Sequence, residues 1–86
     1  MMQITFAEIV ERIKDIVSKE YGRRVFDKDV ARELGISPNS LRVYKATNHI
    51  PYKNVIIFCI SRGVSADWLL FDPDFHPRYI QKAQNH

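Results

Sequence analysis

The chain has 86 residues, of which 45% are hydrophobic and 27% are charged, and its formal net charge is +3. This length and composition indicate one folded domain with one core, and they exclude a largely disordered chain. The longest apolar run, residues 55–60, is far shorter than the roughly 20 residues of a membrane span, and the one cysteine, Cys59, cannot form an internal disulfide. Because Met1-Met2-Gln3 leads into an amphipathic pattern rather than a signal peptide, we expect a cytoplasmic protein with no membrane segment.

The first third of the chain predicts two helices. Residues 5–8, Thr-Phe-Ala-Glu, form a capping box in which the threonine hydroxyl and the glutamate satisfy free amides. Apolar residues then recur at helical spacing until Gly22, which predicts a helix over residues 6–20. Asp27 is a suitable N-cap for a second helix that ends before Gly35.

The next part of the chain predicts three more helices. A serine at the cap and a proline at the first helical position predict a third helix over residues 38–46. Ile50-Pro51 opens a fourth helix that continues to Arg62, and Ser65 caps a short fifth helix over residues 66–71. No strand pattern is present, so we expect an all-α fold of five helices.

We expect this all-α domain to occupy residues 1–75. Residues 76–86 contain a proline and end in polar side chains. They are expected to form a C-terminal tail that is either partly disordered or one extra helical turn begun at Pro77.

The stretch from Asp27 to Ala46 is typical of a helix-turn-helix. One helix stops at Gly35 and the next restarts after a short turn, with Leu41 and Tyr44 expected to face back toward the first. In such a motif the exposed face of the second helix fits the major groove of DNA. Residues 19–62 carry nine basic and four acidic side chains, which places positive charge where phosphate contacts would need it, although a solvated surface would give the same count.

Helical phase predicts which side chains of the third helix would read DNA. If Leu41 marks the buried direction, a rotation of about 100° per residue places four side chains on the outer face. These are Asn39, Arg42, Val43 and Ala46. Arginine can bond guanine, asparagine can bond adenine, and small apolar groups can touch a thymine methyl, so we expect base contacts here. The alternative is an ordinary exposed helix face, or packing of Val43 or Ala46 on a partner chain.

Phosphate contacts are expected from groups at the rim of this face, because basic side chains and helix N-termini attract phosphate oxygens. The candidates are Ser37, Ser40, Lys45, Thr47, Asn48, Lys53, Lys28, Arg23 and Arg24. Each lysine could instead be solvated.

Catalytic and metal-binding patterns are missing from the sequence. His49, His76 and His86 lie far apart, and none has a second ligand three or four residues away on the same helix. Cys59 stands among apolar residues and is expected to be a small core residue rather than a nucleophile. We therefore expect a protein that is not an enzyme, with no cofactor, metal or small-molecule ligand.

The predicted fourth helix is apolar on every side. Such a helix is either central in the fold or covered by another subunit. The candidate dimer contacts are Ile57, Ile60, Phe71 and Phe75. Trp68, behind a serine cap in a short helix, is expected to plug the core.

From about Val30 to Leu70 the chain resembles the helix-turn-helix domain of the bacteriophage CI repressor family, within the lambda-repressor-like fold. The matching residues are Val30-Ala31, Leu34-Gly35-Ile36-Ser37, Leu41, Tyr44, Ile50-Pro51-Tyr52 and the run from Gly63 through Trp68 to Leu70. The resemblance implies a compact five-helix DNA-binding domain of a transcriptional repressor that controls phage lysogeny. It also implies a homodimer bound to a palindromic operator in double-stranded DNA.

Three points qualify what the resemblance implies for this chain. Lambda-like repressors favour glutamine at the start of the second helix, where this chain has Asp27; since a carboxylate repels phosphate, we interpret Asp27 as a cap. Nothing after Phe71 is long enough for a dimerisation and self-cleavage domain, so we expect an isolated DNA-binding domain or a small stand-alone regulator. The alternative from another class is a protein-interaction module on the same fold, such as an anti-repressor or an antitoxin-like partner.

Overall fold

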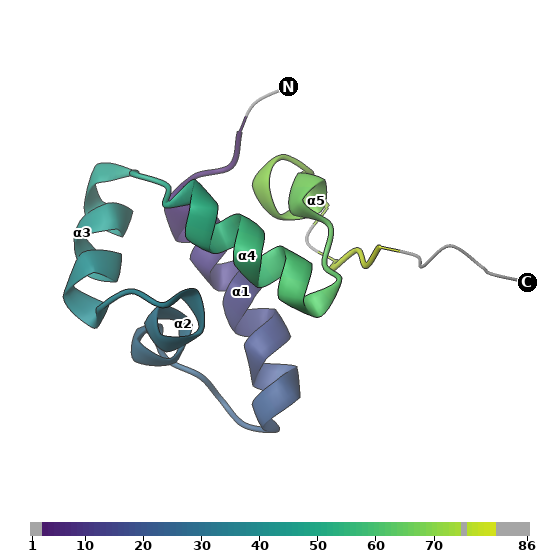
Figure 1. The fold of residues 1–86 in the computed structure, drawn as a ribbon, viewed down its shortest axis with the longest axis horizontal. Coiled ribbons are helices and arrows are strands. Elements are labelled where there is room, and N and C mark those ends of the chain that lie inside the picture. Colours follow the sequence, from purple (N-terminus) through teal and green to yellow (C-terminus); the bar gives the residue numbers. More distant parts are fainter. Residues whose placement is uncertain (1–2, 75, 81–86) are drawn as a thin grey trace, which may run out of the picture.

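The computed structural model describes residues 3–74 and 76–80 of the chain. The helices in this part are α1 (Phe6–Tyr21), α2 (Asp27–Leu34), α3 (Pro38–Thr47), α4 (Tyr52–Arg62) and α5 (Ala66–Leu70). In Figure 1, α4 passes in front of α1, with α2 and α3 toward one end of the molecule and α5 toward the other. The prediction of an all-α fold with five helices is confirmed for the described residues.

The core forms where the apolar stripe of α1 meets the other helices. α1 contacts α2, α3 and α5, while α4 contacts α2 and α5. The buried side chains of α1 include Phe6, Ile9, Val10, Ile13, Ile16 and Val17. They recur at helical spacing, so one face of α1 is removed from water along its whole length. Trp68 of α5 is 1% exposed and plugs the core as predicted.

The ends of α1 follow the signals in the sequence. The Thr5 hydroxyl accepts a hydrogen bond from the Glu8 amide at 3.2 Å, so the hydroxyl half of the predicted capping box is confirmed. The Glu8 carboxylate lies 3.5 Å from Nε of Arg12. Gly22 ends the helix with a φ of 68°, a left-handed conformation that suits glycine.

The predicted cap of α2 is wrong. Asp27 is the first helical residue, and the N-cap position belongs to Phe26, whose amide donates to Oδ2 of Asp29 at 2.8 Å. A carboxylate at the third helical position can reach back to the N-cap amide. The Asp27 carboxylate is directed instead to Lys14 and Lys45.

Two other boundaries differ slightly from the prediction. α4 begins at Tyr52 rather than at Ile50, and Pro51 occupies the N-cap position. A proline disfavours the helical conformation for the residue before it. α5 ends at Leu70, one residue before the expected end at Phe71. None of the helices in the described chain is both long and apolar enough to cross a membrane.

The segment before residue 80 pairs with the connection between α4 and α5. The Ser65 amide donates to the Arg78 carbonyl and the Ile80 amide donates to the Gly63 carbonyl, both at 2.7 Å. Val64 and Tyr79 thereby form an isolated antiparallel bridge. The predicted helical turn at Pro77 is wrong for residues 76–80, because their backbone groups bond to another segment rather than to each other. The expected disorder of the chain end falls on residues 81–86, which lie outside the described residues.

Candidate nucleic-acid interface

α2 and α3 are joined by a turn of three residues. Gly35 ends α2 with a φ of 73°, and the Ser37 hydroxyl then accepts a hydrogen bond from the Ser40 amide at 3.0 Å. Leu41 is fully buried, and the half-buried Tyr44 packs edge-on against Phe6 of α1 with 6.5 Å between ring centroids. These contacts fix the inner face of α3 and therefore the direction of its outer face.

The four predicted base-contacting side chains are all exposed on that outer face. They are Asn39, Arg42, Val43 and Ala46. Arg42 donates a hydrogen bond to Oδ1 of Asn39, which aligns the two polar groups. α3 contains no acidic residue, so nothing within the helix repels a polyanion.

The predicted phosphate-contacting side chains divide by exposure. Lys28 and Lys53 are exposed on α2 and α4, the helices that precede and follow α3. Exposed too are Ser37, Thr47, Arg23 and Arg24, whereas Ser40 is half-buried. Thr47 donates its hydroxyl proton to the Val43 carbonyl at 2.9 Å.

Asn48 has a structural role that the sequence pattern did not predict. It ends α3 with a φ of 54°, and its side-chain oxygen accepts a hydrogen bond from the Phe6 amide at 2.9 Å. It therefore joins the end of α3 to the start of α1 by satisfying one free amide of the α1 N-terminus. A second unpredicted junction is the hydrogen bond from Nδ2 of Asn54 to the Leu34 carbonyl at 2.7 Å, which holds α4 against the end of α2.

Lys45 is paired with an acidic residue. Its Nζ lies 2.9 Å from Oδ2 of Asp27, and Nζ of Lys14 lies 2.7 Å from Oδ1 of the same carboxylate. Partial desolvation opposes ionisation of Asp27, but the hydrogen bonds and charges of the two lysines outweigh it and hold its pKa below the ordinary value of 3.8. Asp27 therefore links α1, α2 and α3 as a negative charge between two cations.

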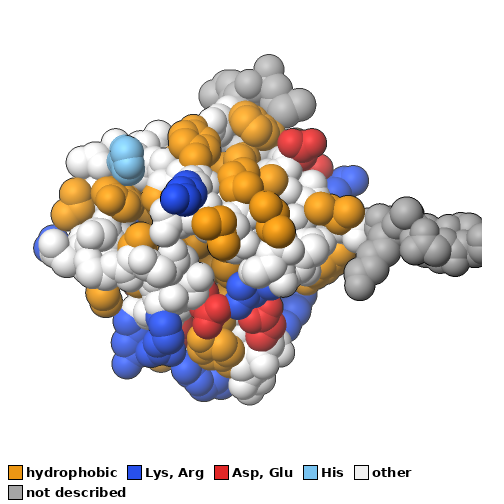
Figure 2. All heavy atoms as spheres, viewed as in Figure 1, with side chains coloured by type: hydrophobic (Ala, Val, Ile, Leu, Met, Phe, Trp, Pro, Cys, Tyr) orange, Lys and Arg blue, Asp and Glu red, His pale blue; other side chains and the backbone are white. Residues whose placement is uncertain are grey.

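Arg23 and Arg24 lie over aromatic rings in the connection between α1 and α2. The Arg23 guanidinium carbon is 4.9 Å from the Tyr21 ring centroid, and that of Arg24 is 5.3 Å from the ring of Phe26. In Figure 2, Lys and Arg side chains gather along the edge of the molecule formed by α2 and this connection. The edge is therefore positively charged beside the α2–α3 unit.

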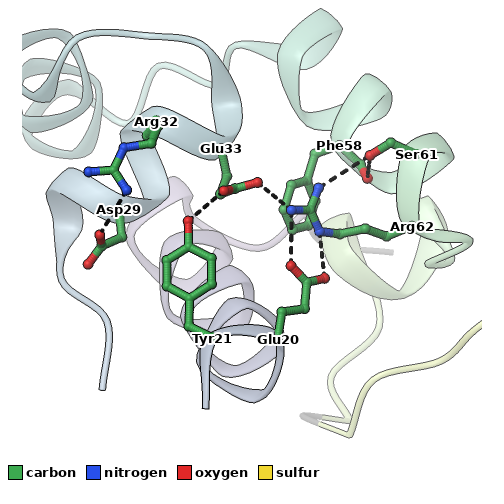
Figure 3. Close-up of polar contacts among 8 residues, drawn as sticks. All are labelled: Glu20, Tyr21, Asp29, Arg32, Glu33, Phe58, Ser61 and Arg62. Atoms are coloured by element: carbon green, nitrogen blue, oxygen red, sulfur yellow. Dashed lines mark hydrogen bonds and ion pairs between the residues drawn. The ribbon is translucent and has the colours of Figure 1, made fainter. Parts of the chain in front are cut away.

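A polar network holds α2 against α1 and α4 (Figure 3). Nε of Arg62 lies 2.7 Å from Oε2 of Glu20, and its Nη2 pairs with Glu33. The Tyr21 hydroxyl donates to Glu33, and this bond, followed by Arg62, lowers the Glu33 pKa against the opposing effect of desolvation. The Arg62 guanidinium carbon is 4.2 Å from the Phe58 ring centroid. The network fixes the orientation of α2 and hence that of α3.

α4 has one buried face and one exposed apolar face. Val55, Phe58 and Cys59 are buried, while Ile57 is 55% and Ile60 is 72% exposed. Figure 2 shows hydrophobic side chains spread over the surface that α4 forms. Phe71, another candidate dimer contact, is half-buried against the core, and Phe75 lies outside the described residues.

Cys59 is a core residue, as predicted. It is 2% exposed, and desolvation raises its pKa to about 11, so the thiol stays protonated at neutral pH. Within residues 3–74 and 76–80, no group of three His, Cys, Asp or Glu side chains is placed to hold a metal ion.

The structure thus defines an all-helical domain whose third helix presents an exposed face of two polar and two apolar side chains. No match to this chain is found among protein-family models, curated proteins or solved structures. A function therefore has to be inferred from the chemistry of α3 and the residues around it.

Proposed function

We propose that this protein is a sequence-specific DNA-binding transcriptional regulator. α2 and α3 act as a helix-turn-helix, and α3 reads the major groove. The order of the five helices and the residues that resemble the phage CI repressor family favour a lambda-repressor-like domain. A phage or prophage repressor of this type, or its N-terminal DNA-binding domain, is the particular regulator we propose.

The outer face of α3 is the observation that carries this proposal. Asn39 and Arg42 are exposed, point the same way and are hydrogen-bonded to each other. Arginine and asparagine are the side chains best suited to bidentate bonds with guanine and adenine. Val43 and Ala46 supply exposed apolar groups that suit a thymine methyl.

The groups around this face suit a phosphate backbone. The amides at the start of α3, with Ser37 as cap, provide a helix N-terminus where anions are favoured. Lys53 and Lys28 are exposed cations, and neither forms an ion pair with another described residue. They can therefore contact phosphates without first losing an internal partner. Such contacts supply affinity for any sequence, whereas the α3 face supplies discrimination.

Selection of bound sites from random DNA, followed by alanine substitution, tests the proposal. Arg42→Ala is expected to cost about 1 to 3 kcal/mol of binding free energy and to relax specificity at one base position. Lys53→Gln is expected to weaken binding to all sequences alike and to reduce the salt slope by about 1. Arg78→Ala, which removes the same charge from a residue remote from α3 in sequence, is the control.

The decisive variant combines Asn39→Ala with Arg42→Ala. If it binds the selected site as tightly as the unaltered chain, α3 does not read DNA and the proposal is wrong.

A second candidate function is that of a protein-interaction module, and the exposed pair Ile57 and Ile60 favours it. Contiguous exposed apolar surface is a common site of protein–protein contact, and Ile57 and Ile60 stand about one turn apart on the exposed face of α4. On DNA, a second copy of this chain bound to a palindromic site would be such a partner. An anti-repressor or antitoxin-like protein would instead retain partner binding in the Asn39 and Arg42 double variant.

A further inference from the structure

The Asp27 carboxylate binds Lys45, a cation near the end of α3 that could otherwise bind a DNA phosphate. Its carboxylate is 42% exposed, whereas the side chains of Lys14 and Lys45, which hold it, are 26% and 28% exposed. The acid therefore lies on the surface side of the ion pair, at the first helical position of α2. Two lysines form a group that attracts phosphate, and here a carboxylate of the protein occupies them.

The two lysines do not depend equally on Asp27. Lys14 has a second acidic neighbour, because its Nζ lies 3.4 Å from Oε2 of Glu11. For Lys45, the acidic partner among the described residues is Asp27. Lys45 follows the buried Leu41 by four residues, so it starts near the inner side of α3, and its side chain, 28% exposed, reaches the surface beside Asp27. Removing the Asp27 charge would therefore release Lys45 more than Lys14.

We propose that Asp27 limits the affinity for DNA of any sequence, because it holds Lys45 in an internal ion pair and so withholds this cation from the phosphate backbone. This inference rests on the proposed function. Non-specific binding comes almost entirely from cations that neutralise phosphates and release counterions. A cation withheld from the backbone weakens binding to all sequences by the same factor, so the discrimination made by the base contacts of α3 is unchanged.

The test compares Asp27→Asn with Glu11→Gln. Both substitutions remove one negative charge next to Lys14, and only the first also removes the partner of Lys45. Binding is measured to a selected duplex and to a scrambled duplex of the same composition over a range of salt concentrations. Circular dichroism and thermal unfolding establish that each variant is folded.

On the proposal, Asp27→Asn binds the scrambled duplex more tightly than the unaltered chain does, and its salt slope is steeper by about 0.9. With a slope change of that size, the ratio of the Asp27→Asn affinity to the affinity of the unaltered chain is about threefold larger in about 50 mM salt than in about 200 mM salt. The ratio of selected to scrambled affinity stays the same, because the released cation strengthens binding to both duplexes alike. Glu11→Gln changes none of these quantities by a comparable amount.

A second comparison does not require Asp27→Asn to fold. Because Lys45 is held by Asp27, Lys45→Gln in the otherwise unaltered chain should weaken scrambled-duplex binding less than Lys53→Gln does. Equal losses from these two variants would overturn the inference, as would equal behaviour of Asp27→Asn and Glu11→Gln. If the unaltered chain binds neither duplex, the proposed function itself fails and the inference fails with it.

Discussion

Asp29 is an acidic side chain with 1% exposure, held by three donors. The Phe26 amide donates to Oδ2 at 2.8 Å, while the guanidinium groups of Arg23 and Arg32 lie 3.3 and 3.4 Å from Oδ1. The backbone hydrogen bond, followed by that from Arg23, holds the pKa of Asp29 below its ordinary value of 3.8. The charged form is therefore the one that the folded protein stabilises.

This lowered pKa predicts how stability depends on pH. The contribution of Asp29 is complete above the unfolded pKa near 3.8, and it is lost as the pH falls through the lower folded value. Asp29→Asn should therefore lower the Tm at about pH 7, and the difference from the unaltered chain should shrink as the pH approaches about 2. Thermal unfolding followed by circular dichroism at several pH values measures this.

Asp67→Asn is the matched control, because Asp67 is exposed in the first turn of α5. Its effect at neutral pH should stay within about 0.5 kcal/mol. A Tm difference for Asp29→Asn that stays constant down to acid pH would contradict the prediction.

The roles of the two aspartates of α2 cannot be predicted from each residue alone. Two aspartates stand in the first turn, and the sequence rule for caps does not distinguish them. Lysines from α1 and α3 decide the role of Asp27, and these contacts exist only once the helices pack. The exposure of Arg42 and Asn39 was predictable, because the phase of one helix determines it.

At the level of single helices, α3 and α5 begin with the same cap. The Ser37 hydroxyl accepts from the Ser40 amide at 3.0 Å, and the Ser65 hydroxyl accepts from the Trp68 amide at 3.2 Å. Removing either hydroxyl leaves one amide of the first turn without its side-chain acceptor. Ser37→Ala and Ser65→Ala should each lower the free energy of unfolding by about 1 kcal/mol in urea titrations.

DNA binding should separate these two variants. Ser37 stands at the α3 N-terminus that we propose to meet phosphate. Ser37→Ala should therefore also weaken the affinity for DNA when it is measured under conditions in which the variant is fully folded. Ser65→Ala should leave it unchanged. Equal effects of both variants on DNA affinity would show that the Ser37 result reflects stability alone.

Arg62 and Arg32 provide a matched pair for the network in Figure 3. Arg62 is 19% exposed and bonds two carboxylates, whereas Arg32 is 62% exposed and lies 3.4 Å from one. Arg62→Met should lower the free energy of unfolding by about 2 kcal/mol, because it leaves Glu20 and Glu33 close together without their shared cation. Arg32→Met should change it by less than about 0.5 kcal/mol. Chemical denaturation measures both, and equal losses would mean that the network does not hold the helices together.

Helix boundaries were predictable where a local signal sets them. Ser37-Pro38 and the glycines at the ends of α1, α2 and α4 act through their own backbone conformation, so the sequence is enough. The pairing of residues 78–80 with residues 63–65 was not predictable, because it depends on how α4 and α5 bring distant backbone groups together. The hydrogen bond from Asn54 to the Leu34 carbonyl was not predictable either, because it forms only when α4 packs against the end of α2.

At the level of the whole molecule, α4 is shared between the core and the surface. Its apolar residues on all sides left open whether it was central or covered by a subunit. The structure places one face inside and leaves Ile57 and Ile60 outside. A partner that covers this pair therefore does not need to disturb the core.

If a second copy of this chain covers Ile60 on DNA, two protomers should bind a palindromic duplex together, with their α3 helices about 34 Å apart. Ile60→Glu and Ile60→Lys should both abolish this joint binding, so that each protomer binds the duplex independently, as measured by analytical ultracentrifugation. Stability should change by no more than about 0.5 kcal/mol, because Ile60 is 72% exposed. Opposite effects of the two charges would indicate an electrostatic influence on DNA rather than loss of an apolar contact.

The backbone pairing of residues 78–80 with residues 63–65 also determines how the protein can be tethered. It anchors this segment at the end of the molecule opposite α3 (Figure 1). A fluorophore, an affinity handle or a fused enzyme joined through the chain beyond residue 80 would therefore leave from the far side. A sensor surface that captures the protein by its C-terminus should leave α3 facing the solution.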